Sequence, residues 1–208
     1  MRAVAVREDI EDLILDAADR LLARYGYRKM TMDDLAQEVG IGKGTLYLHF
    51  RSKEDIALSR VDRLVRRLVE QLREIAAKAD SPSDKLKEML LMRVMFRFDA
   101  VQHYTESLSE VLRDIRPRLL DRHAQQFHSE ALVFADVLKE GQRAGLFRRL
   151  DALSTAHAML AATNSLLPFS LSVRELGKRR EVQETTARIA DLLLQGVLQG
   201  GDRRSSKP

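Results

Sequence analysis

The 208-residue sequence contains no cysteine and no tryptophan, and it has only 4 prolines, 10 glycines and 5% aromatic residues. Without cysteine, the chain can have no disulfides, no thiolate metal sites and no cysteine nucleophile. Few prolines, few glycines and little alternation of the β type favour an all-α fold.

Long apolar runs are also missing. No segment approaches the ~20 apolar residues that a membrane-spanning helix needs, and the N-terminus lacks the apolar core of a signal peptide. We therefore expect a cytoplasmic protein with no membrane partner.

The sequence does contain enough apolar material for a core, with 45% hydrophobic residues beside 32% charged residues. Its length suits one large domain or two small ones at ~150 residues per domain. The formal net charge of +4 is modest for a protein that binds nucleic acid. The placement of the basic residues therefore matters more than their number.

The most informative stretch is residues 31–53, TMDDLAQEVGIGKGTLYLHFRSK, which predicts two short helices joined by a tight turn. Thr31 followed by Asp34 has the form of a capping box that starts the first helix. Gly40 can adopt a positive φ without cost, so the first helix can end there. In the second helix, expected over residues 43–50, Leu46 and Phe50 share a face that we assign to the core.

The other side chains of the second helix are expected on its outer surface: Lys43, Thr45, Tyr47, Leu48 and His49. This surface suits a DNA groove, because Gly44 also allows a backbone to approach closely. An ordinary helical hairpin with a polar surface has the same pattern, so periodicity alone leaves both interpretations open.

The residues GTLYLHFRSKEDI, preceded by TMDDLAQEVGIGKG and by a helix ending at Gly26, closely resemble the DNA-binding segment of the TetR/AcrR family of bacterial transcription regulators. The resemblance covers roughly the first quarter of the chain, and the rest matches in length and helical layout. It implies a three-helix helix-turn-helix DNA-binding domain at residues 1–52 and a connecting helix at 53–79. It further implies a larger helical ligand-binding and dimerisation domain at 80–200, with a disordered tail at 201–208.

The resemblance also implies contacts with an operator in double-stranded DNA, which is expected to be palindromic. Positions that meet phosphates in the family correspond here to Thr31, Thr45, Tyr47, His49 and Lys53. Positions that reach base edges correspond to Gly42, Lys43, Gly44 and Leu48. Lys43 could donate to guanine, whereas Leu48 offers only van der Waals contact. A bulkier residue is often found at the Leu48 position in the family, so no known operator sequence is carried over.

Periodicity and capping signals predict the helices around this stretch. Residues 1–7 are expected to form a loose arm before an amphipathic helix that ends at Gly26. A long helix over residues 52–79 carries several arginines, including Arg60 and Arg63, which we expect on a solvated face.

The second half of the chain begins with a strong helix-start signal in Ser81, Pro82 and Asp84. Two further helices are expected, one ended by Pro117 and one stopping at residues 141–145. A helix at 151–167 and a last helix at 182–199 close the chain. The last helix is apolar almost all round, so it must be covered on more than one side. A four-helix bundle with a second subunit would provide this cover, and burial within one subunit is the alternative.

The resemblance implies a pocket for a small-molecule effector in this second half. The candidate lining residues and polar groups are Met89, Met92, Phe96, His103, Tyr104, Phe127, His128, Met159, Thr163 and Asn164. Methionine and phenylalanine at helical spacing more often fill a core, so ordinary packing remains the alternative.

Metal binding and catalysis find little support in the sequence. His123 and His128 are five residues apart, which lacks the i,i+4 spacing of helical metal sites, and we expect no metal and no cofactor. Asp99, His103 and Ser107 follow one another at four-residue steps, but no oxyanion donor or glycine-rich nucleophile turn accompanies them. A polar row on the surface explains them better than an active site.

The sequence therefore predicts a homodimeric DNA-binding transcription regulator, a repressor that a small molecule releases from its operator. An activator or a DNA binder without a ligand is the alternative within regulation. A helical enzyme or adaptor that keeps the fold is the alternative from another class.

Overall fold

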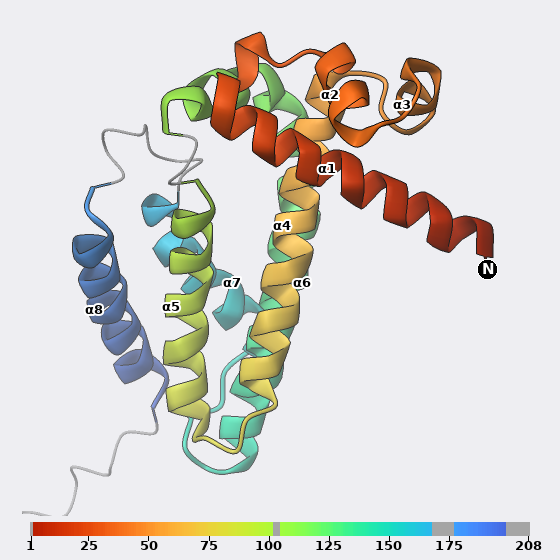
Figure 1. Cartoon of the computed structure of the whole chain (residues 1–208). Helices are drawn as coiled ribbons and strands as arrows, with labels where there is room; N and C mark the ends of the chain where they lie inside the picture. Colours follow the sequence, from red (N-terminus) through yellow and green to blue (C-terminus); the bar gives the residue numbers. More distant parts are fainter. Residues whose placement is uncertain (1, 102–104, 168–176, 199–208) are drawn as a thin grey trace, which may run out of the picture. The chain divides into compact units, whose positions relative to one another are not determined.

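The computed structural model describes residues 2–101, 105–167 and 177–198, and these residues form helices and no strand. This confirms the predicted all-α fold. The chain divides into two compact units, one of Met1–Val65 with Ala100–Arg122 and the other of Arg66–Asp99 with His123–Pro208. The elements are α1 Arg2–Lys29, α2 Met32–Val39, α3 Lys43–His49, α4 Lys53–Ala76, α5 Pro82–Val101, α6 Thr105–Arg143, α7 Ala152–Thr163, the 3-10 turn η2 Asn164–Leu166, and α8 Arg179–Val197 (Figure 1).

The predicted loose arm at residues 1–7 is wrong, because α1 is already helical from Arg2. Residues 2–9 contain no proline and no glycine, so nothing in them stops the helix from extending towards the N-terminus. The backbone leaves the helical conformation at Gly26, where φ is 77° and ψ is 167°. A residue with a Cβ would be strained there, which explains a glycine at the end of the first long segment.

The capping signals around α2 are confirmed. The Thr31 hydroxyl accepts a hydrogen bond from the backbone N–H of Asp34, while the Asp34 carboxylate accepts one from the backbone N–H of Thr31. Gly40 closes the helix in the left-handed conformation, with a φ of 76°. The turn through Gly42 then sets the direction of α3, which ends one residue earlier than predicted, with Phe50 as its C-cap.

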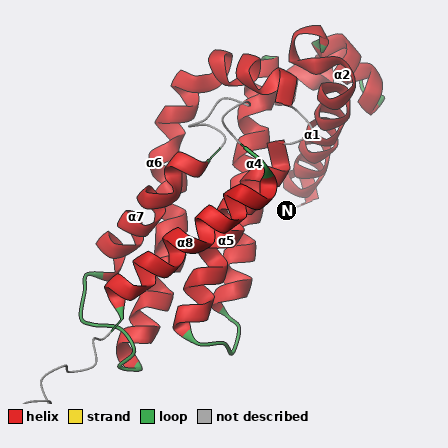
Figure 2. Ribbon diagram, turned by 90° about the vertical axis from the view of Figure 1, so that its left-hand side faces the viewer, coloured by secondary structure: helices red, strands yellow, loops and turns green. Residues whose placement is uncertain are grey.

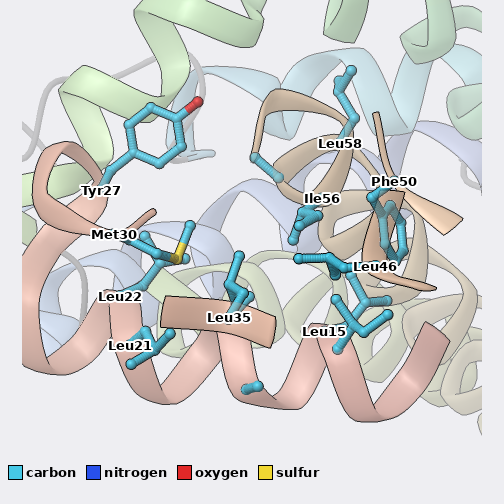
Figure 3. Packing of buried hydrophobic residues seen from close by; sticks show 14 of the residues in the cluster. Leu15, Leu21, Leu22, Tyr27, Met30, Leu35, Leu46, Phe50, Ile56 and Leu58 are labelled. Atoms are coloured by element: carbon cyan, nitrogen blue, oxygen red, sulfur yellow. The ribbon is translucent and has the colours of Figure 1, made fainter. Parts of the chain in front are cut away.

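A single apolar core holds the first unit together. Leu35 of α2, Leu46 of α3 and Ile56 of α4 converge over Leu15 and the neighbouring apolar residues of α1 (Figure 3). Leu46 and Phe50 are both buried, as their spacing predicted. Because these two side chains anchor one side of α3, the opposite side of the helix faces outwards.

Helix α4 begins where predicted, since the Ser52 hydroxyl accepts the backbone N–H of Asp55. The prediction that its arginines lie on a solvated face is wrong for Arg63, whose side chain is buried in the first unit. Periodicity placed Arg63 beside the apolar stripe, but it could not reveal that acidic residues of α1 lie opposite.

The two helices predicted on either side of Pro117 are one continuous helix, α6, with Pro117 inside it. An interior proline costs about 3 kcal/mol, and packing of the neighbouring residues offsets that cost. Ile115 is fully buried in the core of the first unit, and Arg118 forms an ion pair with Asp55 of α4 at 2.6 Å. The rule that a helix ends before proline is a tendency that tertiary contacts can override.

In the second unit, α5 lies antiparallel to both α6 and α8 (Figures 1 and 2). Ion pairs join the helices in both of these antiparallel arrangements. Lys85 near the start of α5 forms an ion pair with Glu140 near the end of α6, and Lys87 forms one with Asp191 near the end of α8. At the other end of α5, both carboxylate oxygens of Asp99 accept hydrogen bonds from Arg179 at the start of α8, each at 2.8 Å.

A close contact joins the end of α6 to the loop before α7. A Cβ at Gly141 would overlap the ring of Phe147, which is buried, so only glycine lets the ring lie against this helix. The backbone N–H of Arg148 donates to the carbonyl of Val197 at 3.0 Å, which ties the loop to the end of α8.

Helix α8 is less apolar all round than predicted. Val182, Thr186, Ala190, Leu194 and Val197 form one buried stripe at helical spacing. Leu192 lies outside that stripe and is 68% exposed, beside exposed polar residues. The helix is therefore covered on one side within the described chain, and an apolar residue remains on its outer side.

Candidate nucleic-acid interface

The outer surface of α3 is a row of exposed residues at Lys43, Gly44, Tyr47 and Leu48. Tyr47 is 44% exposed and Leu48 is 80% exposed, although both are large side chains with apolar surface. A single exposed leucine is ordinary on a protein surface. Here it lies on the same short helix as the exposed Tyr47 and Lys43, and together they form a surface that an external partner could contact.

Glycines leave this surface open. A Cβ at Gly44 would meet nothing within 4 Å, so packing inside the protein does not require glycine there. Gly42 is the N-cap of α3 and provides no side-chain cap. Both positions keep the backbone accessible from outside, which a groove of DNA can use.

Lys43 is held at the surface by Asp33 of α2, with 2.6 Å between the ammonium and the carboxylate. The hydrogen bond from Lys43 to Asp33 raises the pKa of the lysine, and the charge of Asp33 adds to that effect. Lys43 is therefore fully protonated at neutral pH and remains a hydrogen-bond donor.

Two of the predicted phosphate contacts are engaged inside the protein, which corrects the prediction that His49 faces outwards. The His49 side chain is only 10% exposed, and its Nδ1 lies 3.3 Å from a carboxylate oxygen of Glu11. The Lys53 ammonium donates to the carbonyl of Tyr27 at 3.3 Å and lies 4.5 Å from the centre of the Tyr27 ring. Sequence spacing could not show this, because both partners are distant along the chain.

The two threonines differ in their setting. Thr31 is exposed, and its hydroxyl donates to the Asp34 carboxylate at 2.7 Å within the capping box. Thr45 is half-buried on α3. The structure thus brings Thr45, Lys43, Gly44, Tyr47 and Leu48 together on one helix, with Thr31 and Gly42 at the starts of α2 and α3.

An acidic cluster on α1 holds the helix that follows the α2–α3 pair. Arg63 of α4 donates to the carboxylates of Asp16 and Asp19 at 2.7 and 2.9 Å, and its guanidinium also reaches Asp12. Sequence analysis missed this contact. The repeat of aspartate at positions 12, 16 and 19 was a usable signal, because these positions share one face of a helix.

The predicted pocket residues differ in how deeply the structure buries them. Met89, Met159 and Thr163 are buried, whereas His128 is exposed. The half-buried members are Met92, Phe96, Phe127 and Asn164. His103 and Tyr104 lie outside the described residues.

The structure adds three buried charged residues to this region that sequence analysis did not include: Arg93 and Arg97 of α5 and Glu130 of α6. Arg93 Nε and Arg97 Nη2 donate to the two carboxylate oxygens of Glu130, at 2.7 and 2.5 Å. Arg93 also donates to the Thr163 hydroxyl at 2.7 Å and to the Asn164 side-chain oxygen at 2.8 Å. Thr163 and Asn164, two of the polar residues that were predicted to meet a ligand, are therefore bound to Arg93.

Three aromatic rings lie next to this cluster. The His157 ring of α7 stacks on Phe127 and on His128 of α6, with ring centres 5.5 and 5.6 Å apart. Arg93 lies 5.8 Å from the centre of the Phe127 ring, on which its cation can act. Among the described residues, no group of three histidine or acidic side chains could hold a metal ion.

Helices in the described part of the chain are either too short or too polar to cross a membrane. This leaves the exposed row on α3 and the buried cluster in the second unit as the features to compare with known proteins.

A family model for the bacterial regulatory proteins of the tetR family matches residues 14–59. The chain is 30% identical over 148 residues to the HTH-type transcriptional repressor KstR2 of Mycobacterium tuberculosis, over 65% of this chain and 68% of that protein. It is 25% identical to the fatty acid metabolism regulator protein of Bacillus subtilis, over 78% of this chain and 91% of that protein. A TetR transcription regulator from Haloarcula marismortui has the same fold, with a TM-score of 0.71 at 22% identity over 92% of this chain and all of that one.

The family model covers the second half of α1, then α2, α3 and the start of α4, and it therefore includes the exposed row on α3. The relatives extend the similarity into the helices of the second unit. The chain therefore belongs to the TetR family of bacterial transcription regulators, which bind DNA and are not enzymes.

Proposed function

We propose that the protein is a homodimeric repressor that binds a palindromic operator through α3 and leaves it when a small molecule binds in the second unit. The observation that carries the DNA-binding surface is the row of Lys43, Tyr47 and Leu48, exposed on a helix whose opposite face is anchored by Leu46. The similarity to a protein named as a repressor supports the direction of regulation.

Within this proposal the residues of the row have different tasks. Lys43, with Gly42 and Gly44 beside it, reads base edges, and Leu48 makes van der Waals contact with a thymine methyl group. Tyr47, Thr45 and Thr31 meet phosphates and fix the register of the helix on the duplex. His49 and Lys53 support this surface from within, through Glu11 and Tyr27.

The dimer is proposed to form through the outer surfaces of α7 and α8. Leu192 is 68% exposed on α8, and small residues are exposed along α7 at Ala158, Ala161 and Ala162. Small residues let helices approach closely, and a two-fold axis would pair each helix with its own copy. Two reading helices about 34–36 Å apart could then enter successive major grooves.

The effector is proposed to act through helices that belong to both units. Helices α4 and α6 each contribute residues to both units, so a movement of either helix in the second unit is transmitted along a continuous element. The ligand must bind the DNA-released form more tightly than the DNA-bound form, because equal binding to both would shift nothing.

Mapping of bound sites across the genome of the source organism tests the proposal first. We expect a small set of intergenic palindromes, and increased transcription of the adjacent genes when the gene for this protein is deleted. Decreased transcription would make it an activator. If the protein binds its operator specifically and no compound in a metabolite screen weakens that binding, release by a small molecule would be ruled out.

A further inference from the structure

Among the described residues, the charges of the buried cluster of Arg93, Arg97 and Glu130 do not balance. Arg93 and Glu130 are each 1% exposed and Arg97 is 8% exposed, which places two positive charges against one negative charge in the interior. Burying an ion is expensive unless an opposite charge compensates it, so an excess charge at such a site needs an explanation.

The two arginines use their donors differently. Arg93 uses four N–H donors, in bonds to Glu130, Thr163 and Asn164 and to the carbonyl of Leu160. Arg97 makes two side-chain hydrogen bonds in the described part of the chain, one to Glu130 and one to the backbone carbonyl of Arg93. A guanidinium has five N–H donors, so Arg97 retains donors for a further acceptor.

The acidic residue that follows Arg97 on α5 is committed to another partner. Asp99 lies two residues beyond Arg97, but both of its oxygens accept from Arg179. The positive charge is permanent at neutral pH, because burial lowers the pKa of Arg93 only to about 10, with the charge of Glu130 opposing the effect.

The surroundings of the charged cluster are apolar. Phe127 lies against Arg93, and the Leu160 side chain is fully buried beside the carbonyl that Arg93 contacts. On α5, the buried Met89 lies one helical turn before Arg93, and Phe96 directly precedes Arg97 in the sequence. A partner for Arg97 in this setting would combine one negative charge with an apolar body.

We propose that Arg97, held by Arg93 and Glu130, binds the anionic group of the effector, and that the effector is a small apolar molecule with one carboxylate or phosphate. That the bound anion is the effector rests on the proposed function, whereas the binding of an anion at Arg97 does not. Arg97 contacts the anion, while Arg93 and Glu130 are positioning residues.

Thermal unfolding of the full chain with four probes of equal chain length tests the site. Octanoate and octyl phosphate should raise the melting temperature, and octanol and octylamine should raise it much less. Of octanoate and octyl phosphate, the one that raises the melting temperature more identifies the charged group that the site prefers. Equal stabilisation by octanol and octanoate would overturn the proposal, because apolar burial alone would then explain binding.

Variants separate the site from a purely structural role. Arg97→Gln leaves Arg93 and Glu130 as a balanced pair, so it should melt no lower than the wild type without a probe and lose the response to octanoate. Arg97→Lys should keep part of the response, and Arg180→Gln, at an exposed ion pair on α8, should keep all of it. The contrary result has two parts: the wild type does not respond to either anion, and Arg97→Gln is less stable than the wild type. Together they would show that groups of the chain itself balance the charge of Arg97.

Operator binding measured in parallel distinguishes this inference from the proposed function. Octanoate that binds through Arg97 without weakening DNA binding would remove the effector role and leave the anion site. Release of DNA by a neutral compound, unchanged in Arg97→Gln, would overturn the proposal that the effector is an anion and leave induction intact.

Discussion

Arg63 of α4 and Asp16 of α1 are joined by a hydrogen-bonded ion pair of 2.7 Å, although 47 residues separate them in the sequence. Asp19 accepts from the second terminal nitrogen of the same guanidinium at 2.9 Å. Because Arg63 is buried and its partners are half-exposed, the contact fixes the angle between α1 and α4 in the unit that carries α3.

Removing this guanidinium should destabilise the first unit. In Arg63→Met, three aspartates of α1 lose their common partner and repel one another, and we expect the free energy of unfolding to fall by about 2 kcal/mol. Urea unfolding measures the change. Arg67→Met, at an exposed position on the same helix, is the control and should have little effect. An equal loss of unfolding free energy in the two variants would show that the ion pairs of Arg63 stabilise the unit no more than an exposed arginine does.

A methyl group at Gly141 should disturb the end of α6. The Phe147 ring occupies the space that a Cβ would need, so Gly141→Ala must displace a buried ring. We expect a loss of about 1–3 kcal/mol in stability, although alanine usually stabilises a helix relative to glycine. Gly44→Ala on α3, where space is open, should not lose stability. Thermal unfolding of both variants gives the comparison, and a more stable Gly141→Ala protein would contradict the packing.

Acid should weaken the second unit through Glu130. Burial alone would raise the pKa of this carboxyl group, but the charges of Arg97 and Arg93 outweigh burial and lower it below the ordinary value of 4.5. Below that value the unfolded chain takes up a proton before the folded chain does. The contribution of Glu130 to stability is therefore present above the ordinary pKa and is lost as the pH falls through the lowered folded pKa.

Carboxyl carbon shifts of Glu130, followed by NMR during an acid titration, measure this pKa directly. The Glu130 signal should change at a lower pH than that of an ordinary glutamate. Asp136→Asn, at an exposed residue of α6 paired with Lys139, should leave the Glu130 titration unchanged. A Glu130 midpoint at or above the ordinary value would mean that burial outweighs the two arginines.

A charge on the outer side of α8 should break the proposed dimer. Leu192→Glu places a carboxylate at the exposed apolar residue, and burial of that charge between two copies would be unfavourable. Arg67→Glu, at an exposed position of α4 outside the proposed interface, is the control. Sedimentation should find monomers for Leu192→Glu and dimers for the control. A Leu192→Glu dimer would place the interface elsewhere.

Signals between residues close together in the sequence predicted helices α2 and α3 well. The capping box at Thr31, the left-handed Gly40 and the anchors Leu46 and Phe50 all depend on neighbours within four residues, and all are confirmed. The family followed from the same stretch, because α2 and α3 must keep a fixed geometry to present one surface.

Long-range contacts could not be predicted in this way. Arg63 and Arg93 resemble surface arginines in sequence, and only the approach of α1 and α6 gives them carboxylate partners in the interior. The same holds for His49 and Lys53, whose partners come from α1. Pro117 resembles a helix end until the packing of Ile115 is known. The sequence therefore indicated which residues of α3 are exposed, while it gave no sign that Arg63 and Arg93 are buried.

The affinity of two α3 variants for operator DNA tests the proposed reading surface most directly. In fluorescence anisotropy, Lys43→Ala should weaken binding to the mapped operator by about ten-fold or more and leave random duplex nearly unaffected. Tyr47→Ala, which would remove a proposed phosphate contact, should weaken both duplexes alike. Gln37→Ala, at an exposed position of α2 outside the row, is the control with wild-type affinity. Wild-type affinity for the operator in both Lys43→Ala and Tyr47→Ala would contradict the assignment of α3 as the reading helix.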